Sequence, residues 1–423
     1  MPAFPVTHLG ECRHVSPLPR HVSDDVQVPA EIHWTGGRAP HEPDLFEQAG
    51  PRARLFFDPA RTRAGIVTCG GLCPGLNNVI RSLVLQLHHG YGVREVLGYQ
   101  GGYGGLDPAG GAPPLQLTLE LVDKIHKHGG TILGTSRGPV NVAAAVDDLV
   151  RRGVNVLFTI GGDGTQRGGH ALFHEAQRRG HALAVVGIPK TIDNDVAFVS
   201  RTFGYLTALE QACVMIDRAH TEAHSVKNGV ALVRLMGRSA GFIAAGATLA
   251  SQDVNFCLIP EVPFSLEGPG GFLATLQRRL QARAHAVIVV AEGAGQDLVA
   301  GAATERDASG NAKLKDIGVF LRERIEAHFK AEGMPVVMRY IDPGYLIRSC
   351  SANAEDAIQC DLFARHAVHA AMAGKTGLVI GLLHDRYIHV PIDLLTAAQK
   401  QIDPEESQWQ AVLACTGQPA RFA

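Results

Sequence analysis

The sequence of residues 154–168 is VNVLFTIGGDGTQRG, and three of its features decide the fold. Residues 154–160 form an apolar, β-branched run, which is typical of a strand buried on both faces of a parallel sheet. A glycine-rich turn at residues 161–165 follows at once, and a helical stretch begins near Gln166. A strand, a glycine turn and a helix in this order predict one repeating unit of an α/β fold.

The same alternation of strand and helix continues along most of the chain. Buried strands are expected at residues 64–68, 154–160, 183–188, 230–235 and 287–290. Helices are expected at residues 77–87, 119–126, 143–152, 166–179, 205–224, 268–282, 317–330 and 355–373. The alternation predicts parallel sheets with helices on both faces, in which ligands bind at the carboxyl ends of the strands.

The composition indicates a large globular protein with neither nucleic acid nor an anionic membrane as a partner. The chain has 423 residues, of which 46% are hydrophobic, and this length favours two or three α/β domains. Its 39 Lys and Arg nearly balance its 41 Asp and Glu, so no basic face or tail is visible. The sequence contains neither a signal peptide nor a membrane span, and we therefore expect a cytoplasmic protein.

The two ends of the chain differ in texture from the middle. Residues 1–60 are rich in proline and histidine and have no helical or strand period. We expect them to form an extended arm that packs on the body of the protein or on a neighbouring subunit. The sequence after His384 is polar, and we expect it to be poor in strands.

The first expected strand ends in a glycine-rich loop at residues 69–78, CGGLCPGLNN, and a helix follows. Glycines let the backbone approach a bulky anion, and the N-terminus of a helix offers free N–H groups. A phosphate-binding loop and a merely tight turn both fit, and the Gly-Lys-Ser/Thr of a Walker A loop is absent. Cys69 and Cys73 lie here without a second pair at zinc spacing, which favours buried, reduced thiols over a metal site.

Two later loops carry carboxylates. In GGDGT, residues 161–165, the glycines around Asp163 suit a carboxylate that reaches a magnesium–phosphate complex, and the alternative is a helix cap. In PKTIDND, residues 189–195, Asp193 and Asp195 alternate along an extended segment, which predicts side chains on opposite faces. One of them would then be the base that takes a proton from an alcohol attacking a phosphoryl group. The alternative is an Asx-type turn on the surface.

Other strand ends carry cations and one more carboxylate. Arg238 lies in MGRSAG at residues 236–241, and two further arginines lie in RYIDPGYLIR at residues 339–348. Arginine offers the forked hydrogen-bond donors that suit phosphate. Glu292 follows the strand expected at residues 287–290 and is placed to accept hydrogen bonds from sugar hydroxyls.

These loops together resemble the 6-phosphofructokinase family. The matching segments occur in family order between about residues 64 and 349 and are GGLCPGLNN, GTSRGP, GGDGT, PKTIDND, MGRSAGFIA, AEG and YIDPGYLIR. GGDGT alone is also similar to NAD kinases and diacylglycerol kinases, whereas PKTIDND followed by MGR is specific. The texture of the loops is similar to the ATP-dependent branch that contains plant and trypanosomatid enzymes.

The resemblance implies an α/β fold of two Rossmann-like three-layer domains with parallel-rich sheets and an active site in the cleft between them. Residues 61–203 and about 349–385 would form the nucleotide-binding domain, and residues 204–348 the fructose 6-phosphate-binding domain. Residues 1–60 would be an extended N-terminal arm and residues 386–423 a C-terminal tail. The implied partners are fructose 6-phosphate, ATP, Mg²⁺ and further copies of the chain in a dimer or tetramer.

The resemblance also implies a role for each matching residue. Asp193 would be the general base on the 1-hydroxyl of fructose 6-phosphate. Thr191 would help to place the transferred phosphoryl group, and Arg238 would neutralise its charge. Asp163 would hold the Mg²⁺ that bridges the donor phosphates. The nucleotide would be lined by Gly71, Arg137, Gly138, Gly162, Asp163, Gly164 and Thr165. The sugar phosphate would be bound by Thr191, Ile192, Asp193, Met236, Gly237, Arg238, Glu292, Tyr345, Leu346, Ile347 and Arg348.

Two positions bear on the phosphoryl donor. In this family a glycine after the GGD aspartate leaves room for the α-phosphate of ATP, whereas a bulkier Asp goes with pyrophosphate, and this chain has Gly164. Lys190 points the other way, because a lysine before Thr-Ile-Asp often accompanies pyrophosphate use. Gly164 acts by steric exclusion and Lys190 can serve either donor. We therefore expect ATP, with a pyrophosphate-dependent enzyme as the alternative.

One departure from the family pattern concerns the oligomer. The best-known bacterial members have an arginine nine residues before the MGR arginine, and it reaches a substrate in the neighbouring subunit. This chain has Gly229 there, which puts substrate sharing across an interface in doubt. A non-catalytic sugar-phosphate or nucleotide sensor is disfavoured, because Asp163, Thr191, Asp193 and Arg238 are all present. An NAD kinase would not account for PKTIDND and MGR.

Overall fold

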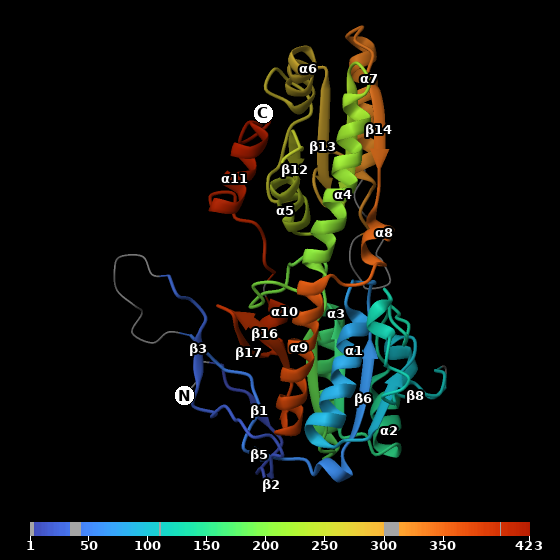
Figure 1. Ribbon diagram of the computed structural model, residues 1–423, viewed down its shortest axis with the longest axis vertical. Helices are drawn as coiled ribbons and strands as arrows, with labels where there is room; N and C mark the ends of the chain where they lie inside the picture. The colour runs from blue at the N-terminus through green and yellow to red at the C-terminus, as the bar shows by residue number, and fades with distance from the viewer. Residues whose placement is uncertain (1–3, 34–43, 110, 300–312, 398) are drawn as a thin grey trace. The chain divides into compact units, whose positions relative to one another are not determined.

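The computed structural model describes residues 4–33, 44–109, 111–299, 313–397 and 399–423 (Figure 1). The chain divides into two compact units. Unit 1 consists of Met1–Thr191, Val196–Gly204 and Ser349–Gln399, and unit 2 of Ile192–Asp195, Tyr205–Arg348 and Lys400–Ala423. The short segment Ile192–Asp195 therefore belongs to unit 2, although the chain on either side of it belongs to unit 1.

Unit 1 is built around a seven-stranded sheet that is parallel except at its two edges. Across the sheet lie, in order, β17 (Arg386–Pro391), β16 (Leu378–Leu383), β10 (Ala184–Pro189), β9 (Val156–Gly161), β6 (Arg63–Thr68), β7 (Glu95–Tyr99) and β8 (Leu115–Gln116). The edge strands β17 and β8 are antiparallel to their neighbours. Every residue of β9 and β10 is buried, which explains why their sequences are nearly continuous apolar runs.

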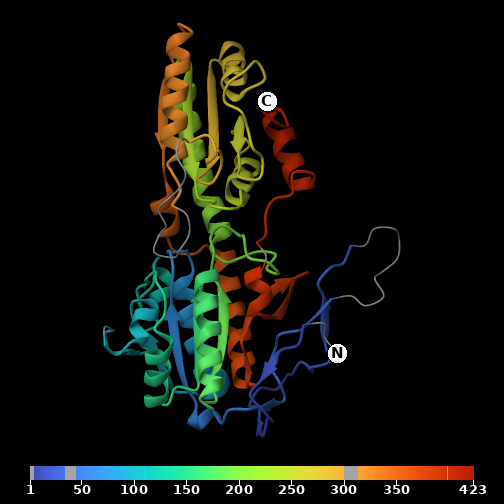
Figure 2. The same ribbon diagram turned by 180° about the vertical axis from the view of Figure 1, so that it is seen from behind.

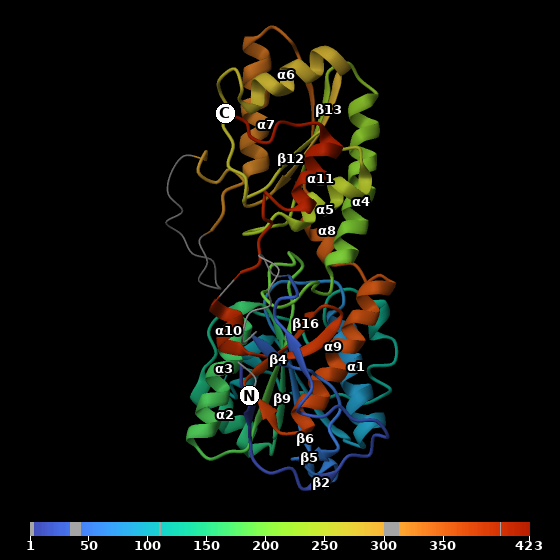
Figure 3. The same cartoon turned by 90° about the vertical axis from the view of Figure 1, so that its left-hand side faces the viewer.

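Helices cover both faces of this sheet. Figure 3 shows α2 (Val142–Arg151) and α3 (Asp163–Arg178) on one side and α1 (Leu76–Leu85) and α9 (Ala354–Met372) on the other. Shorter helical pieces of unit 1 are η2 (Pro59–Arg61), η3 (Gln86–Tyr91), η4 (Gly102–Leu106), η5 (Ile125–Lys127) and α10 (Ile392–Ala397). Asn141 and Asn353 cap α2 and α9, because their side chains accept backbone N–H groups of the first turn.

Unit 2 has a four-stranded sheet in which all strands are parallel. Its order is β12 (Phe256–Leu258), β13 (His285–Ala291), β11 (Gly229–Leu235) and β14 (Val337–Ile341), and the short helix α8 (Gly344–Arg348) follows β14. Figure 3 shows α6 (Phe272–Arg283) and α7 (Ile317–Ala331) on one face of this sheet. The other face is covered by α4 (Tyr205–His224) and α5 (Phe242–Ser251), with α11 (Ser407–Thr416) against α5. No helix in the described ranges of either unit is both long and apolar enough to cross a membrane.

All five expected strands are confirmed, with ends that differ by at most two residues. The helix expected at residues 119–126 is wrong, because the chain forms turns there and only the short segment η5 is helical. The Thr118 hydroxyl accepts the Leu121 N–H at 3.1 Å within one of these turns.

We expected the segment after His384 to be poor in strands. This expectation is wrong at its start, because Arg386–Pro391 form β17. Its polar side chains disguise a strand that pairs antiparallel with β16 along six residues. One of these polar side chains, His389, is fully buried, because the N-terminal segment of the chain covers it.

The N-terminal residues form short strands that pack on unit 1. We had expected this segment to pack either on the body of the protein or on a neighbouring subunit. They are β1 (Thr7–His8), β2 (His14–Val15), β3 (Gln27–Pro29), β4 (Leu45–Glu47) and β5 (Arg54–Leu55). β1 pairs with β15 (Lys375–Thr376), and Gln48 forms a bridge with Ile388 of β17. Figure 2 shows these blue strands beside the red strands β16 and β17, which lie at one edge of the sheet.

All eight cysteines are free thiols. Cys69 and Cys73 are buried, as we expected, and so are Cys257 and Cys360, whereas Cys12, Cys213 and Cys350 are half-buried and Cys415 is exposed. Burial raises the pKa of Cys69 to about 12, so this thiol at the glycine-rich loop stays protonated and unreactive near neutral pH.

A buried cluster of charges fixes the N-terminal segment to the sheet. One oxygen of Glu47, Oε1, accepts hydrogen bonds from Arg52 at 2.5 Å, from His389 at 3.1 Å and from the Lys375 ammonium group. These four side chains are at most 7% exposed, and the more exposed Asp24 is a second partner of Arg52 and Lys375. Burial raises the pKa of Glu47, but hydrogen bonds and charges of His389 and Lys375 lower it by more, so it lies well below its usual range.

We expect Glu47→Gln to lower the free energy of unfolding by about 3–5 kcal/mol, because it leaves buried cations without their main partner. Urea unfolding followed by circular dichroism measures the change. Because the folded-state pKa is lowered, the wild-type carboxylate contributes fully above its unfolded pKa, and this contribution is lost as the pH falls. The difference between the two proteins should therefore shrink below about pH 4.

Glu11→Gln is the matched control for this prediction. Glu11 lies 3.1 Å from Arg13, and both side chains are more than three-quarters exposed. Removing this surface charge should change the free energy of unfolding by less than about 0.5 kcal/mol. Equal effects of the two substitutions would show that the buried cluster does not hold the N-terminal segment in place.

Candidate active site

The predicted site residues fall into two sets that belong to different units. Those of unit 1 are Gly71, Arg137, Gly138, Gly162, Asp163, Gly164, Thr165, Lys190 and Thr191. Those of unit 2 are Ile192, Asp193, Met236, Gly237, Arg238, Glu292, Tyr345, Leu346, Ile347 and Arg348. The chain passes from one set to the other between Thr191 and Ile192.

In unit 1 the predicted loops follow three neighbouring parallel strands, β6, β9 and β10. Hydrogen bonds join them into one surface. The Lys190 ammonium group donates to the carbonyl of Gly71 at 2.7 Å, and the backbone N–H of Lys190 donates to Gly161 at 3.0 Å. Gly70 donates to the carbonyl of Ser136 at 3.0 Å, which ties the GTSRGP segment to the same loop. The structure therefore brings the predicted unit 1 residues together.

At four of the predicted glycines a Cβ atom would meet no close contact. A Cβ atom built on Gly138 would have no neighbour within 4 Å, and one on Gly164 would have only Arg167 Nη2 at 3.9 Å. At Gly71 and Gly162 the nearest atom would be 3.5 Å away. By contrast, a Cβ at Gly161 would lie 2.1 Å from the Thr165 hydroxyl, because that glycine is packed in the fold. The open glycines leave room for a bulky ligand to approach the backbone.

Asp163 is the first residue of α3, and its side chain is half-buried. The residue that precedes the helix is Gly162, so the alternative in which Asp163 caps α3 is wrong. In the same first turn Thr165 is buried, and its carbonyl accepts the Tyr103 hydroxyl at 2.5 Å. Asp163 thus presents a carboxylate between two open glycines at the positive end of a helix dipole.

This environment fits a magnesium ion that is carried by a nucleotide. Within the described ranges, no group of three or more His, Cys, Asp or Glu side chains forms a metal cage. Mg²⁺ bound to phosphates needs no such cage, since one or two carboxylates, water and phosphate oxygens complete its coordination. A single half-buried carboxylate at Asp163, beside glycines with room for phosphates, provides what the protein must contribute.

In unit 2 the predicted residues follow the carboxyl ends of β11, β13 and β14, which are also neighbours. Gly293 donates its N–H to the carbonyl of Gly237 at 3.0 Å, which joins the AEG and MGR loops. Gly237 has φ 131°, and a Cβ there would lie 2.6 Å from the carbonyl oxygen of Ala240, so this position requires glycine. The backbone N–H of Arg238 donates to Oδ2 of Asp193 at 3.4 Å.

The segment that carries Asp193 is not extended, which corrects the expectation that Asp193 and Asp195 alternate in direction. Asn194 between them has φ 58°, a left-handed conformation that asparagine tolerates better than most residues. The segment is not a surface turn either, since Asn194 is buried and Ile192 packs against the core of unit 2. The carbonyl of Asp195 accepts the N–H of Lys400 at 3.0 Å.

Glu292 lies among charged side chains at the end of β13. Burial raises the pKa of its carboxyl above the usual range, although the charges of Arg234, Arg238 and Arg348 lower it. The Arg348 guanidinium group lies over the Tyr345 ring, 4.5 Å from its centroid. Glu292, Arg238 and Arg348 are thus close enough to influence one another, as their predicted common role requires.

Two predicted residues of unit 2 are buried in its core. Met236 is 8% exposed and Ile347 is fully buried, and both side chains belong to the core of unit 2. Their neighbours Tyr345 and Leu346 are 74% and 64% exposed. Ile347 therefore anchors helix α8 to the core of unit 2, and Tyr345 and Leu346 are exposed to solvent.

Sequence reasoning missed two features that contact the predicted residues of unit 2. Arg234, in β11, lies 3.6 Å from the Glu292 carboxylate. The sequence feature that could have identified it is a single charged residue in an otherwise apolar strand. Gln401 donates its side-chain amide to the carbonyl of Ser239 at 2.9 Å, next to Arg238. No local sequence pattern marks this second contact.

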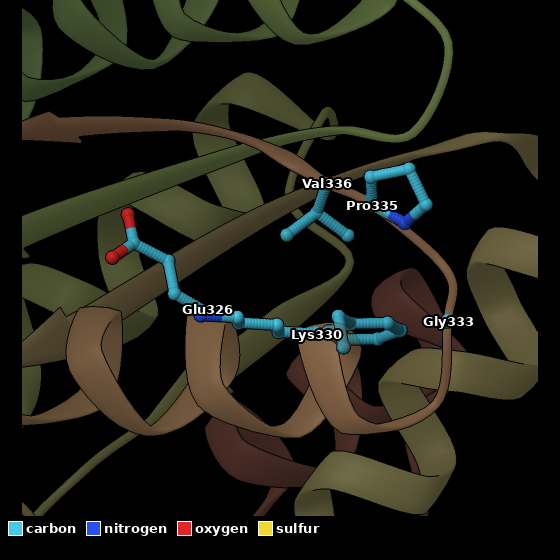
Figure 4. A pocket seen from close by; sticks show the side chains of 6 residues that line it. Glu326, Lys330, Gly333, Pro335 and Val336 are labelled. Carbon is cyan, nitrogen blue, oxygen red and sulfur yellow. The ribbon is translucent and has the colours of Figure 1, made fainter.

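A cavity of about 310 Å³ lies elsewhere in unit 2 (Figure 4). It is lined by Glu326, Phe329, Lys330, Gly333, Pro335 and Val336. They lie in the last turns of α7 and in the loop between α7 and β14, so the cavity lies at the opposite end of the parallel sheet from the predicted residues. It contains no predicted site residue.

Comparison with known proteins gives a consistent result. Residues 63–371 match the protein family described as Phosphofructokinase. Over 432 residues the chain is 44% identical to a Borreliella burgdorferi protein described as ATP-dependent 6-phosphofructokinase, covering 98% of this chain and 97% of that protein. Over 402 residues it is 47% identical to an Arabidopsis thaliana protein described as ATP-dependent 6-phosphofructokinase 7, covering 95% and 81%.

Among solved structures, the fold is similar to that of a pyrophosphate-dependent phosphofructokinase from Marinobacter aquaeolei, with a TM-score of 0.69. The match covers 84% of this chain and 91% of that one, at 19% sequence identity. At this identity the likeness establishes the two-domain, parallel-rich α/β fold and carries no argument about the phosphoryl donor.

Proposed function

The chain belongs to the phosphofructokinase family, and on that basis we propose that it phosphorylates the 1-hydroxyl of fructose 6-phosphate with ATP, a step of glycolysis. Its identity to ATP-dependent 6-phosphofructokinases over nearly the whole chain supports this reaction. In the structure, the observation that carries it is the Asp193 carboxylate held at the backbone of Arg238. This contact holds the carboxylate at the loop that carries Arg238, and it supports the proposal because phosphoryl transfer to an alcohol uses a positioned base and nearby positive charge.

On the acceptor side, Asp193 takes the proton of the 1-hydroxyl while that oxygen attacks the γ-phosphorus of ATP. The bond from the γ-phosphorus to its bridging oxygen breaks, and ADP leaves. Arg238 neutralises negative charge on the transferred group, and Thr191 helps to place it. Little covalent chemistry is asked of the protein, because positioning and charge stabilisation account for most of the catalysis of phosphoryl transfer.

On the donor side, we assign the nucleotide to the surface formed by the open glycines of unit 1. The backbone there accepts close approach at Gly71, Gly138, Gly162 and Gly164, and Arg137 adds a cation. Asp163 would hold Mg²⁺, which when bound offsets the charge of the donor phosphates. Thr165 completes this set by anchoring the first turn of α3 through Tyr103.

The preference for ATP over pyrophosphate is assigned to Gly164. A Cβ atom on Gly164 would meet only Arg167 Nη2, at 3.9 Å, so an α-phosphate can lie against this glycine, whereas an aspartate there would bring a negative charge into the same space. Lys190 does not argue against ATP, because its ammonium group is held by the carbonyl of Gly71 and supports the loop. This contact gives Lys190 a role in supporting the loop, which either donor allows.

The sugar phosphate is assigned to unit 2. Glu292 accepts hydrogen bonds from sugar hydroxyls, and Arg348 with Tyr345 and Leu346 forms the exposed face of α8. Gly237 contributes backbone, as does Ile192, while Met236 and Ile347 support the site from the core. We also propose a cytoplasmic homo-oligomer, a dimer or tetramer, which the near-neutral net charge of −2 allows without a nucleic-acid or membrane partner.

We expect Asp193→Asn to lower turnover by about 10²–10⁴-fold while fructose 6-phosphate still binds, because only the proton acceptor is removed. Steady-state kinetics gives kcat, and calorimetric titration gives the dissociation constant of the sugar phosphate. Asp253→Asn is the control, since Asp253 is a half-exposed carboxylate of unit 2 that lies 3.3 Å from His220. Near-normal turnover in Asp193→Asn would rule out this residue as the base.

We expect Gly164→Asp to reduce kcat/KM for ATP by more than about tenfold, a loss of about 1.4 kcal/mol, because the new carboxylate crowds and repels the α-phosphate. The matched control is Ala182→Asp, which adds the same charge at an exposed residue of unit 1, before β10. It should leave kcat/KM for ATP unchanged. If Gly164→Asp uses ATP as well as the control does, the steric basis of donor choice is wrong.

A further inference from the structure

Arg234 is the one charged residue in β11, whose sequence is GVALVRL. Six of the seven residues of this central strand are buried, and the Arg234 side chain is 21% exposed. Placing a guanidinium group in such a strand is costly unless its partners are in position. The side chain lies near the carboxyl end of the strand, four residues before Arg238.

Three carboxylates surround this guanidinium group. The Asp342 carboxylate accepts a hydrogen bond from it, the Glu292 carboxylate lies 3.6 Å away, and the Asp316 carboxylate lies 3.8 Å away. These partners are far apart in the sequence. A planar guanidinium group with several N–H donors can address all three at once, whereas a lysine ammonium group is a single point of charge.

Each of these carboxylates belongs to a residue that lies next to the start or the end of a helix or strand of unit 2. Oδ1 of Asp342 accepts the N–H of Gly344 at 3.1 Å, at the start of α8. Asp316 precedes α7, and its Oδ1 accepts two backbone N–H groups of the first turn at 3.0 Å. Glu292 directly follows β13. Arg234 therefore links the end of β13 and the starts of α7 and α8 through one side chain.

Without Arg234, three negative charges would face one another. Glu292 would be affected most, because burial already raises its pKa and Arg234 is one of three arginines that lower it. The charges of Arg238 and Arg348 would still lower the pKa of Glu292, and the charge of Asp342 would still raise it. A protonated Glu292 donates one hydrogen bond and accepts fewer, so it would bind sugar hydroxyls differently.

We propose that Arg234 is a positioning residue for fructose 6-phosphate, holding Glu292 and α8 in the arrangement that binds the sugar phosphate. This inference rests on the proposed function, and it adds a residue that the family motifs do not include. Arg234 acts through Glu292 and through Asp342, which orients the helix of Tyr345 and Arg348. It does not touch the reacting atoms.

The test compares Arg234→Gln with Arg234→Lys in the full-length protein. We expect Arg234→Gln to lower kcat/KM for fructose 6-phosphate by about 10²-fold, chiefly through KM, because misplaced binding groups cost this much. The KM for ATP should not change, since the nucleotide residues belong to unit 1. Arg234→Lys keeps the charge without the fork and should recover part of the loss.

The pH profile separates positioning from a general loss of stability. Removing the Arg234 charge should raise the pKa of Glu292 further, so the acid limb of kcat/KM for fructose 6-phosphate should move to higher pH. The carboxylate is needed in its ionised form, and activity is therefore lost as pH falls through this raised pKa. A merely structural role would lower activity at every pH by the same factor.

A double substitution tests the link to α8. Asp342→Asn alone should also raise the KM for fructose 6-phosphate, and combining it with Arg234→Gln should cost less than the product of the two single effects. Arg324→Gln is the control, because it breaks an exposed ion pair with Glu267 in the same unit. It should behave like the wild type.

The outcomes separate this inference from the proposed function. Absence of fructose 6-phosphate phosphorylation by the wild-type protein would refute the proposed function. Normal wild-type activity with an unchanged KM for fructose 6-phosphate and an unmoved acid limb in Arg234→Gln would overturn the role of Arg234 alone. An equal rise of both KM values in Arg234→Gln would also overturn it, since that result indicates general disruption.

Discussion

Both units depend on parallel strands that are buried on both faces. Such strands expose almost nothing but their ends, and parallel pairing brings the carboxyl ends of neighbours to one edge of the sheet. β6, β9 and β10 therefore gather the glycine loops and Asp163, while β11, β13 and β14 gather Arg238, Glu292 and α8. The positions of the chemical groups follow from strand order more than from any single contact.

Two kinds of interaction then set the details at these edges. In unit 1 the important contacts are made by the backbone, because open glycines and carbonyls such as that of Gly71 define the surface. In unit 2 they are made by charged side chains, with Arg234 among three carboxylates and Arg348 on Tyr345. This difference suits the two ligands, since phosphates can lie along a backbone surface, whereas a sugar phosphate requires hydrogen-bond acceptors as well as cations.

The sequence predicted what local patterns can encode. The buried strands appear as apolar runs, and the loops after them appear as glycines and carboxylates. What it did not predict depends on distant partners. β17 looked polar because it contains His389. The partner that allows this histidine to be buried is Glu47, which lies more than three hundred residues earlier in the chain. Arg234 is visible as the one charge in an apolar strand, but its carboxylate partners are far apart in the sequence, and the left-handed Asn194 lies in a segment that looked extended.

The most direct measurement is the formation of fructose 1,6-bisphosphate by the purified protein with Mg²⁺ and fructose 6-phosphate, supplied in parallel with ATP and with pyrophosphate. We predict product with ATP and none with pyrophosphate. Product with pyrophosphate alone would keep the roles of Asp193 and Arg238 but contradict the donor choice at Gly164. No product with either donor would contradict the reaction itself.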